Sequence, residues 1–429
     1  MKSLWTANLK KPIFRVMEND ISTDVLIIGG GLAGILACYK LNEAGISSTL
    51  VEKREICSGT TQNTTAKITY QHNLIYHKII EKYGISAAKK YYEANKEAFS
   101  DFCTLALNYD CDFEFKDNYI YSLSDVSIIK KEAAALASIG ADFSLTNETD
   151  LPFNIAGAVK NKKQAQIHPL KFLYRISEKL NIYEHTFVTK IKNNTAYTDK
   201  GKISAKKIII ATHFPFINKH GMYSAKMFQN RSYVLALSGA PDLNGMYLDE
   251  SKSGYSFRNY KNWLLIGGGN HRTGKTNNDI QILKNFAVDT FPSCEIKYIW
   301  AAQDCISLDE VPYIGQYSIL TPDIYTITGF NKWGFTSAML ASSILCDKLT
   351  GNNNIHADIF NPSRSMLNKQ LFVNSINSAA DFLSFSTKRC PHLGCALKYN
   401  KAEHSWDCPC HGTRINNNGY VLDNPANKQ

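Results

Sequence analysis

The first strong hydrophobic pattern of the chain is an unbroken aliphatic run at 25–28, directly after Asp24. A short run without polar interruptions is typical of a strand that is buried on both faces. Residues 29–34 follow as Gly-Gly-Gly-Leu-Ala-Gly, and residues 35–41 are mostly apolar, as in a buried helix. A second apolar strand is expected at 48–51. The pattern predicts a strand, a glycine turn, a helix and a parallel strand, which together begin an α/β fold.

The glycine turn has the spacing of a dinucleotide-binding site. Gly29 permits the tight turn, Gly31 lets the backbone approach a pyrophosphate, and Gly34 lets the helix pack on the strand. The N-terminus of the helix then faces the anion. Glu52 ends the second strand 18 residues beyond Gly34, where its carboxylate can accept hydrogen bonds from ribose hydroxyls. A glycine-rich turn without a ligand is the alternative, and later segments of the chain favour the dinucleotide site.

Other patterns predict a second unit in the middle of the chain. A helix is expected at 86–107, and strands are expected at 112–123, 233–237 and 263–267. Residues 365–385 carry apolar side chains at roughly helical spacing. We therefore expect a separate substrate domain, and an amphipathic segment that leads to the C-terminal part.

The cysteines divide into two groups. Four of the 11 cysteines fall close together, where residues 390–395 read Cys-Pro-His-Leu-Gly-Cys and residues 408–412 read Cys-Pro-Cys-His-Gly. The other seven are isolated and are interpreted as small buried apolar residues; they are Cys38, Cys57, Cys103, Cys111, Cys294, Cys305 and Cys346.

Short strands are predicted around both cysteine segments. Residues 396–399 and 405–407 alternate between apolar and polar side chains, and residues 415–422 form a hairpin pattern around Asn418-Gly419. Both cysteine segments are therefore expected as loops on β ribbons.

This motif resembles the two cluster-binding loops of Rieske proteins, which read Cys-x-His and Cys-x-x-His with an additional cysteine in each loop. A Rieske centre holds one iron by two thiolates and the other iron by two neutral imidazoles. The resemblance implies that Cys390 and Cys408 ligate the first iron of a [2Fe–2S] cluster. His392 and His411 then ligate the second iron.

The resemblance further implies a disulfide between Cys395 and Cys410 that ties the two loops together. A structural zinc site is the competing interpretation, but zinc sites do not need six ligand-type residues at this spacing. Rieske proteins of high potential often have hydroxyl donors at the positions of Thr413 and Ile415. Since Ile415 cannot donate, we expect a reduction potential below the top of the range of about −150 to +300 mV.

Several segments of the main body resemble the D-amino-acid oxidase and glycine oxidase superfamily of FAD-dependent enzymes. Residues 58–67 resemble its flavin-contacting loop, 187–188 the edge at the adenine half, and 207–213 the strand that closes the dinucleotide site. Residues 309–315 and 329–335 resemble its final segment, in which a helix directs its N-terminus at the flavin. FAD is preferred to NAD because these flavin-side segments have no role in a simple nicotinamide site.

The FAD site that this resemblance implies draws on all of these segments. Its expected residues are Gly29, Gly31, Leu32, Ala33, Gly34, Glu52, Lys53, Thr60, Thr61, Thr65, Val188, Ala211, Thr212, Gly329, Lys332, Trp333, Gly334 and Phe335.

The predicted fold class is α/β + β. It combines a Rossmann-like FAD-binding domain, a substrate domain with an antiparallel sheet, and a small all-β Rieske cluster-binding subdomain. The predicted boundaries are 22–71, 156–220 and 300–352 for the FAD-binding domain, 72–155 and 221–299 for the substrate domain, 353–386 for a linker or helix, and 387–429 for the Rieske subdomain.

The substrate site has weaker sequence signals. Arg231, Tyr233 and Arg272 lie in the predicted substrate domain, where an arginine could clamp a carboxylate with paired hydrogen bonds. A solvated surface arginine is the alternative. His72 and His77 lie near the flavin loop, but lone histidines on a helical segment are more often structural, so no catalytic base is assigned.

The distribution of charge and of apolar residues limits the classes of partner that we expect for this chain. Lysines and arginines outnumber acids by 48 to 38, but they are scattered, so we expect no nucleic-acid partner and a surface suited to acidic proteins. Residues 1–20 lack the apolar core of a signal peptide, and no stretch approaches the about 18 to 20 apolar residues that span a bilayer. We therefore expect no membrane insertion and a cytoplasmic location. Thiols stay reduced there, so clustered cysteines indicate metal or redox chemistry.

Two redox centres in one chain suggest an electron-transfer sequence. The family resemblance implies a small amine or amino-acid substrate, and the cluster implies an external electron carrier protein. The sequence predicts an FAD-dependent dehydrogenase that passes electrons from FAD through the cluster to that carrier. Two alternatives stay open: a ferredoxin-linked reductase with reversed electron flow, and an electron-transfer or redox-sensing module without its own substrate.

Overall fold

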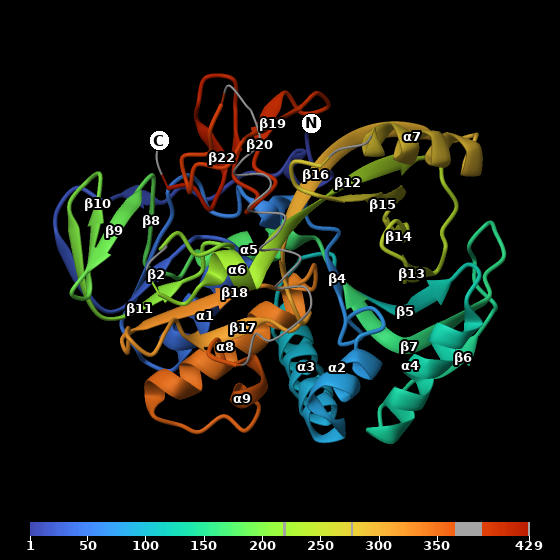
Figure 1. Ribbon diagram of the computed structural model, residues 1–429, viewed down its shortest axis with the longest axis horizontal. Helices are drawn as coiled ribbons and strands as arrows, with labels where there is room; N and C mark the ends of the chain where they lie inside the picture. Colours follow the sequence, from blue (N-terminus) through green and yellow to red (C-terminus); the bar gives the residue numbers. More distant parts are fainter. Residues whose placement is uncertain (218–219, 276–277, 365–387, 428–429) are drawn as a thin grey trace.

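Two large β-sheets with their helices form the main body, and a small third sheet lies against it at the top of Figure 1. The structure is a computed structural model that describes residues 1–217, 220–275, 278–364 and 388–427. Its layers confirm the predicted α/β + β fold class, with a Rossmann-like domain, a mostly antiparallel second sheet and an all-β C-terminal sheet. The amphipathic segment predicted at 365–385 lies outside the described residues.

The first sheet is parallel at its centre. Its order is β1-β8-β3-β2-β11-β10-β9, with β18 parallel to β11 and β17 antiparallel to β18. The strands are β1 (Arg15–Val16), β2 (Ile21–Ile28), β3 (Ser48–Val51), β8 (Ile182–Glu184), β9 (Val188–Lys192), β10 (Thr195–Thr198), β11 (Lys202–Ile210), β17 (Tyr313–Gln316) and β18 (Ile324–Thr328). Helix α1 (Leu32–Glu43) connects β2 to β3, which confirms the βαβ unit.

The aliphatic run in β2 is buried on both faces because alternate side chains point in opposite directions. Val25 and Ile27 belong to the large core that includes α1 and α8 (Gly334–Thr350). Leu26 and Ile28 belong to the core on the opposite side, which includes residues of β10 and β11. The sheet therefore lies between two apolar layers.

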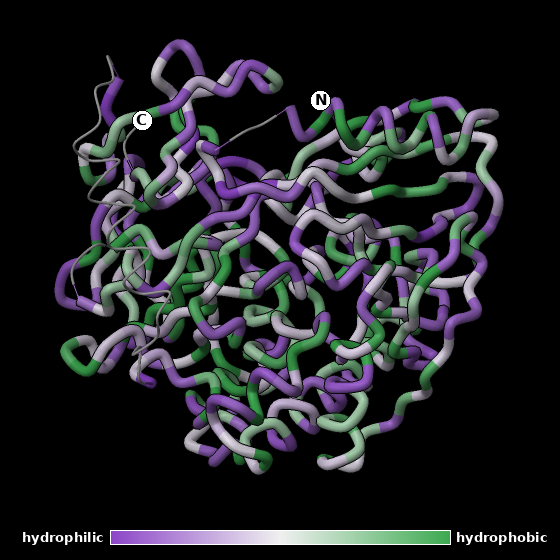
Figure 2. Tube along the Cα trace, turned by 45° about the vertical axis from the view of Figure 1, so that its right-hand side comes forward, coloured by the Kyte–Doolittle hydropathy of each residue, from purple (hydrophilic) through white to green (hydrophobic). Residues whose placement is uncertain are grey.

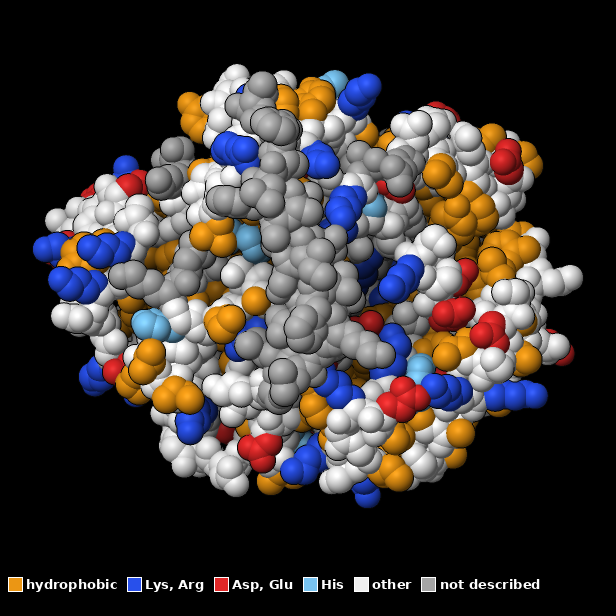
Figure 3. Space-filling model, viewed as in Figure 1, with side chains coloured by type: hydrophobic (Ala, Val, Ile, Leu, Met, Phe, Trp, Pro, Cys, Tyr) orange, Lys and Arg blue, Asp and Glu red, His pale blue; other side chains and the backbone are white. Residues whose placement is uncertain are grey.

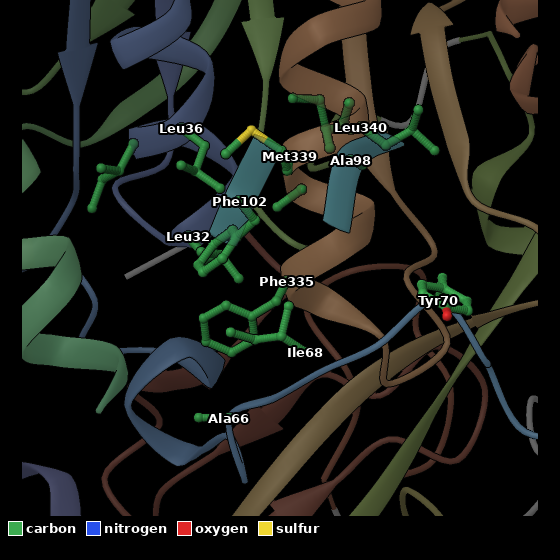
Figure 4. Close-up of a cluster of buried hydrophobic side chains, with 14 of the residues drawn as sticks. Leu32, Leu36, Ala66, Ile68, Tyr70, Ala98, Phe102, Phe335, Met339 and Leu340 are labelled. Carbon is green, nitrogen blue, oxygen red and sulfur yellow. The ribbon is translucent and has the colours of Figure 1, made fainter. Parts of the chain in front are cut away.

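Helix packing fixes the N-termini of α1 and α8 close to the carboxyl ends of the parallel strands. Figure 4 shows Leu32 and Leu36 of α1 with Phe102 of α3 (Ile85–Ala106) and Phe335 and Met339 of α8 in one buried cluster. All of these side chains are buried. The other helices of the described chain are α2 (Tyr76–Tyr83), α4 (Val126–Ser138), α5 (Pro169–Ser177), α6 (Tyr223–Lys226), α7 (Asp279–Thr290) and α9 (Ala357–Phe360), with 3-10 turns at Leu4–Thr6 and Thr60–Asn63.

The second sheet has the order β16-β12-β15-β14-β13-β5-β7-β4, and β6 pairs with β7. Its strands are β4 (Lys67–Ile68), β5 (Glu114–Ser122), β6 (Ser144–Thr146), β7 (Gly157–Gln166), β12 (Met227–Ser238), β13 (Gly245–Asp249), β14 (Ser256–Tyr260), β15 (Trp263–Arg272) and β16 (Glu295–Ser307). The pairs are antiparallel except β5 with β13, which is parallel. The strands expected at 112–123, 233–237 and 263–267 are β5, part of β12 and part of β15.

Three strands lie in a different sheet from the one that the expected domain boundaries imply. β4 falls in the range 22–71, β7 in the range 156–220 and most of β16 in the range 300–352, and all three ranges were expected in the FAD-binding domain. These strands pair within the second sheet. Local alternation predicts a strand but not its partner, because pairing depends on distant segments.

The third sheet is an antiparallel meander, β19-β20-β21-β22. Its strands are β19 (Lys398–Asn400), β20 (Ser405–Asp407), β21 (Arg414–Ile415) and β22 (Val421–Asp423). β21 and β22 form the hairpin expected around Asn418-Gly419. Figure 1 shows this sheet, in red, beside the first sheet and the end of β16.

The surface carries its charge in a dispersed form. In Figure 3, Lys and Arg side chains are spread over the visible face with Asp and Glu among them. Figure 2 shows hydrophobic segments in green through the central strands and helices, and hydrophilic purple segments in many outer turns. Within the described ranges, no helix combines the length and apolar character that crossing a bilayer requires.

Candidate functional site

A cavity of about 860 Å³ lies at the carboxyl ends of the parallel strands, between the two large sheets. Its wall includes residues that directly follow β2, β3, β11 and β18, and residues of β12, β15 and β16. Open α/β sheets bind their ligands at this edge. All of the expected FAD-binding residues line this cavity except Gly34.

Gly34 instead allows the close contact between α1 and the glycine turn. A Cβ atom at Gly34 would lie 1.9 Å from the carbonyl oxygen of Gly29, so no larger residue fits there. This is the packing role expected of the third glycine of the turn. Glu52 braces the turn, because its Oε2 accepts a hydrogen bond from the N–H of Gly30 at 2.8 Å. Glu52 also lines the cavity, where a ribose-binding acid is expected.

The loop at 58–67 closes the cavity beside α1. Thr61 Oγ1 accepts a hydrogen bond from the N–H of Leu32 at 3.0 Å, so it caps the first turn of α1. Thr60 Oγ1 donates to the carbonyl oxygen of Gln303 in β16 at 3.0 Å. Trp300 Nε1 donates to the carbonyl oxygen of Asn63 at 2.9 Å. These bonds fix the loop to both α1 and the second sheet, so this part of the cavity wall is preorganised.

The start of α8 forms the opposite part of the wall. The ring of Trp333 stacks on His72, with centroids 5.0 Å apart and an interplanar angle of 15°. His72 also bonds to Tyr91 and Thr336 and has its pKa lowered to about 3 by burial, so it is a neutral positioning residue. Lys332 lines the cavity, and burial lowers the pKa of its ammonium group.

His77 has a structural environment as well. Its Nδ1 lies 2.6 Å from Oε2 of Glu132, a carboxylate that is fully buried beneath α2. The same carboxylate accepts hydrogen bonds from the backbone N–H groups of Tyr76 and His77. This network holds α2 against α4. Because His72 and His77 both have structural environments, neither is assigned as a catalytic base.

We expect Gly31→Val to remove most of the bound FAD. A Cβ at Gly31 would lie 3.1 Å from Thr61 Oγ1, and the valine methyl groups extend further into the space where the pyrophosphate meets the helix N-terminus. The measurement is the flavin-to-protein ratio after purification. Gly157→Ala is the control, since its Cβ would meet Val126 at an ordinary distance of 3.5 Å away from the cavity. Full flavin occupancy in Gly31→Val would contradict the placement.

The C-terminal sheet carries two loops of matching geometry. In the first loop the N–H of Cys390 donates to the carbonyl oxygen of Cys395 at 2.8 Å, and the N–H of Gly394 donates to that of Cys390 at 2.9 Å. The second loop repeats both bonds between Cys408, Gly412 and Thr413, at 2.8 and 2.9 Å. Two short loops closed in the same way present their side chains toward one shared point.

The four expected ligands fit a mixed thiolate and imidazole cluster. The thiols of Cys390 and Cys408 are close enough to hydrogen-bond to each other. The rings of His392 and His411 lie 4.9 Å apart between centroids. Nδ1 of His411 is buried and has no hydrogen-bond partner among the described residues. Burial, and then the nearby Arg272 guanidinium, lower the pKa of His411 to about 4, which leaves the neutral imidazole that binds iron.

The surroundings of the loops are apolar. Ile415 packs in one buried cluster with the cysteines and Leu397, where a Rieske protein of high potential would offer a donor. The Sγ atoms of Cys395, Cys408 and Cys410 all lie within 4.8 Å of one another. This proximity is compatible with the disulfide between Cys395 and Cys410, which stays a prediction.

We expect His392→Cys or His411→Cys, where a cluster still assembles, to lower its reduction potential by about 100 mV or more, because a thiolate adds negative charge to the iron. Potentiometric titration of the cluster absorbance measures this shift. His404→Asn is the control, since His404 is exposed in the turn between β19 and β20. An unchanged potential in both cysteine variants would mean that neither histidine is a ligand.

The second loop is bonded to strands that form the cavity wall. Gln303 Nε2 donates to the carbonyl oxygen of Gly412 at 2.8 Å, and Gln229 Nε2 donates to that of His411 at 2.9 Å. Gly412 has a φ of +84°, and a Cβ there would lie 2.5 Å from Gln229 Cβ. The backbone of the loop therefore rests directly on β12, an approach that only glycine permits.

The three residues expected to bind substrate lie at this interface. Arg231 forms a buried bidentate ion pair with Glu403 in the turn between β19 and β20, and Tyr233 donates to the same carboxylate at 3.3 Å. Arg272 donates from Nε to the carbonyl oxygen of Pro409 at 2.9 Å. Arg231 is not among the cavity-lining residues of the described chain, whereas Tyr233 and Arg272 are. The polar ends of all three side chains bind the C-terminal sheet, and we propose docking instead of substrate binding as their role.

Comparison with known proteins agrees with both parts of the chain. Residues 24–348 match the family of FAD dependent oxidoreductases (DAO), and residues 363–429 match the Rieske [2Fe-2S] domain. The chain belongs to the FAD-dependent oxidoreductase family. FAD and a [2Fe–2S] cluster are therefore the cofactors of this oxidoreductase, and the cysteine group of the C-terminal sheet fits the cluster.

Individual relatives of this oxidoreductase cover most of the chain. The putative Rieske 2Fe-2S iron-sulfur protein YhfW of Bacillus subtilis (strain 168) is 31% identical over 100% of this chain and 96% of its own. Gamma-glutamylputrescine oxidoreductase of Escherichia coli (strain K12) is 23% identical over 81% of this chain and 88% of its own. The structure of glycine oxidase from Bacillus cereus ATCC 14579 has a TM-score of 0.65 at 20% identity, over 81% of this chain and 100% of that chain.

Proposed function

We propose that this FAD-dependent oxidoreductase oxidises a small amine or amino-acid-like substrate and passes the electrons through its cluster to an external carrier protein. FAD accepts an electron pair from an organic substrate, and a Rieske cluster carries one electron at a time. The chain's own residues support such a sequence because side chains of the cavity wall bond directly to the second cluster loop.

The observation that carries the proposal is the bonding between the cavity wall and the second cluster loop. Gln303 and Arg272 line the cavity, and the same side chains donate to the carbonyl oxygens of Gly412 and Pro409. A single layer of side chains therefore lies between the flavin cavity and the loop that carries His411. This arrangement favours transfer within the chain without a large movement of the C-terminal sheet.

The first cluster loop supports an external acceptor. His411 is buried against the body, but Pro391 and Leu393 on either side of His392 are exposed, and 46% of the Leu393 surface is accessible. A carrier protein can approach this loop without displacing the body. We propose that electrons enter the cluster on the His411 side and leave on the His392 side.

The substrate class is supported by acids in the cavity wall. Asp249 and Glu250 follow one another at the end of β13, and both line the cavity. Asp249 is buried and accepts from the N–H of Ser251 at 2.8 Å, which fixes its carboxylate. A carboxylate at this position can bind a protonated amine through a charge-assisted hydrogen bond. The E. coli protein is named for a putrescine derivative and the B. cereus protein for glycine, that is, for an amine derivative and an amino acid.

Anaerobic mixing with a panel of amines and amino acids tests the proposal. We expect one chemical class to bleach the flavin absorbance, followed by reduction of the cluster in a second phase. Asp249→Asn should raise the KM for that class more than it lowers kcat. If no compound bleaches the flavin, the chain has no substrate of this class. A cluster potential well below that of the flavin would instead support reversed electron flow, since electrons move spontaneously to the more positive centre.

A further inference from the structure

One end of the FAD cavity is closed by residues of the Rieske subdomain. Leu422, Asp423, Asn424 and Asn427 line the cavity. The dinucleotide-binding residues Glu52, Lys53 and Val188 belong to the same wall. We propose that residues 422–427 are part of the FAD-binding site, so that FAD binding and docking of the cluster subdomain stabilise each other. We call residues 422–427 the closing segment.

Two asparagine side chains attach the closing segment to the FAD-binding sheet. Asn424 Nδ2 donates to the carbonyl oxygens of Thr212 and Phe214, which follow β11. Asn427 Nδ2 donates to the carbonyl oxygens of Val188 and Thr189 in β9, at 3.1 and 3.3 Å. Thr212 and Val188 themselves line the cavity, so the segment is bonded to residues of the wall it completes.

The closing segment is also fixed from the side of the Rieske subdomain. Asp423 pairs with Arg414 at 2.9 Å and lies 3.8 Å from Arg231. Gln229 Nε2 donates to the carbonyl oxygen of Asn424 at 2.8 Å and to that of His411 in the cluster loop. One side chain thus holds both the cluster loop and the closing segment. Displacement of either disturbs the other.

The physical consequence is a reciprocal coupling. FAD contacts a complete wall only when the subdomain is docked, and a docked subdomain gains contacts when FAD is bound. A ligand that binds one state better shifts the equilibrium toward it, and the factor is the same in both directions. No local pattern indicates this role, because an asparagine outside a recognisable motif is most often a solvated surface residue.

The test measures FAD affinity in the full chain with its cluster. After gentle removal of FAD, its rebinding is followed by the quenching of FAD fluorescence. We expect Asn424→Ala together with Asn427→Ala to raise the Kd for FAD about tenfold, because each substitution removes a side chain with two hydrogen bonds that hold the closing segment. Asn417→Ala, an exposed residue of the β21–β22 hairpin, is the matched control and should leave the Kd unchanged. Iron content must stay equal in all of these proteins.

The reverse direction is tested on the unaltered protein. We expect a chelator to remove iron several-fold more slowly from the FAD-loaded chain than from the FAD-free chain, because bound FAD keeps the cluster subdomain docked. The proposal requires both a higher Kd for FAD in the double variant and slower iron release from the FAD-loaded chain. A double variant with the control's Kd, or equal iron release with and without FAD, overturns the proposal. Neither readout depends on substrate turnover, so a failure of the proposed amine oxidation leaves this test intact.

Discussion

We expect the variant with Cys390→Ser and Cys408→Ser to lose electron transfer to a protein acceptor by on the order of a hundredfold or more, because the one-electron relay is gone. Reduction of FAD by substrate should stay close to the wild-type rate. That half-reaction needs only the cavity, whose described wall is built mainly from the two large sheets. FAD is added in excess, so that any weaker binding of FAD in this variant does not limit the rate.

The measurement is rapid mixing with flavin and cluster absorbance followed separately. Cys294→Ser with Cys346→Ser is the matched control, because it removes two partly exposed thiols outside the cluster. The wild type should also produce little hydrogen peroxide with an artificial one-electron acceptor. Equal rates of protein-acceptor reduction with and without the cluster would rule out the relay.

Arg231→Met should strongly weaken docking of the cluster subdomain. The Arg231 guanidinium and the Glu403 carboxylate are each less than a tenth exposed. When Arg231 is removed, Glu403 loses its bidentate partner and keeps the ion pair with Arg414 and the longer hydrogen bonds from Tyr233 and Asn400. Breaking a buried pair by removing one partner costs about 3 to 5 kcal/mol, because the buried charge that is left behind loses part of its compensation. Flavin-to-cluster electron transfer should slow accordingly, and the subdomain should become more sensitive to protease.

A double-mutant cycle separates the interaction energy of the Arg231–Glu403 pair from the contributions of the surrounding residues. Arg231→Met with Glu403→Met removes both charges and should recover a large part of the loss, since no unpaired charge stays buried. Lys206→Met is the control, because its ion pair with Asp24 is exposed and should contribute at most about 1 kcal/mol. A loss in Arg231→Met no larger than in Lys206→Met would mean that the buried pair does not hold the subdomain.

The local patterns were sufficient to predict the βαβ unit and the identity of both cofactors. The run at 25–28, the glycines at 29–34 and the acid at Glu52 predicted a βαβ unit, which the structure has as β2, α1 and β3. Each of these features acts over a few residues: the glycine spacing sets a turn, and the apolar run sets burial. The cysteine and histidine spacing at 390–411 predicted two cluster loops for the same reason, because each loop is short and closed by its own backbone bonds.

The interface between the cofactor sites could not be predicted in this way. Arg231 and Glu403 are 172 residues apart in the chain. From the strand pattern alone, an arginine could equally well bind a substrate, face the solvent or pair with a buried acid. Asn427 gives no sign that it reaches Val188. Such partners are chosen when whole sheets pack together, since the free energy of burial and pairing depends on what lies opposite.

The sequence by itself therefore determined the fold class, the family and the chemistry of both cofactors, because these depend on residue types at short fixed spacings. Only the tertiary structure decided that β7 and β16 join the second sheet, that Arg231, Tyr233 and Arg272 turn toward the cluster subdomain, and that this subdomain closes the FAD cavity. The physical reason is that the local sequence around a strand or a charged side chain does not specify its partner. The partner depends on which distant segments pack against it.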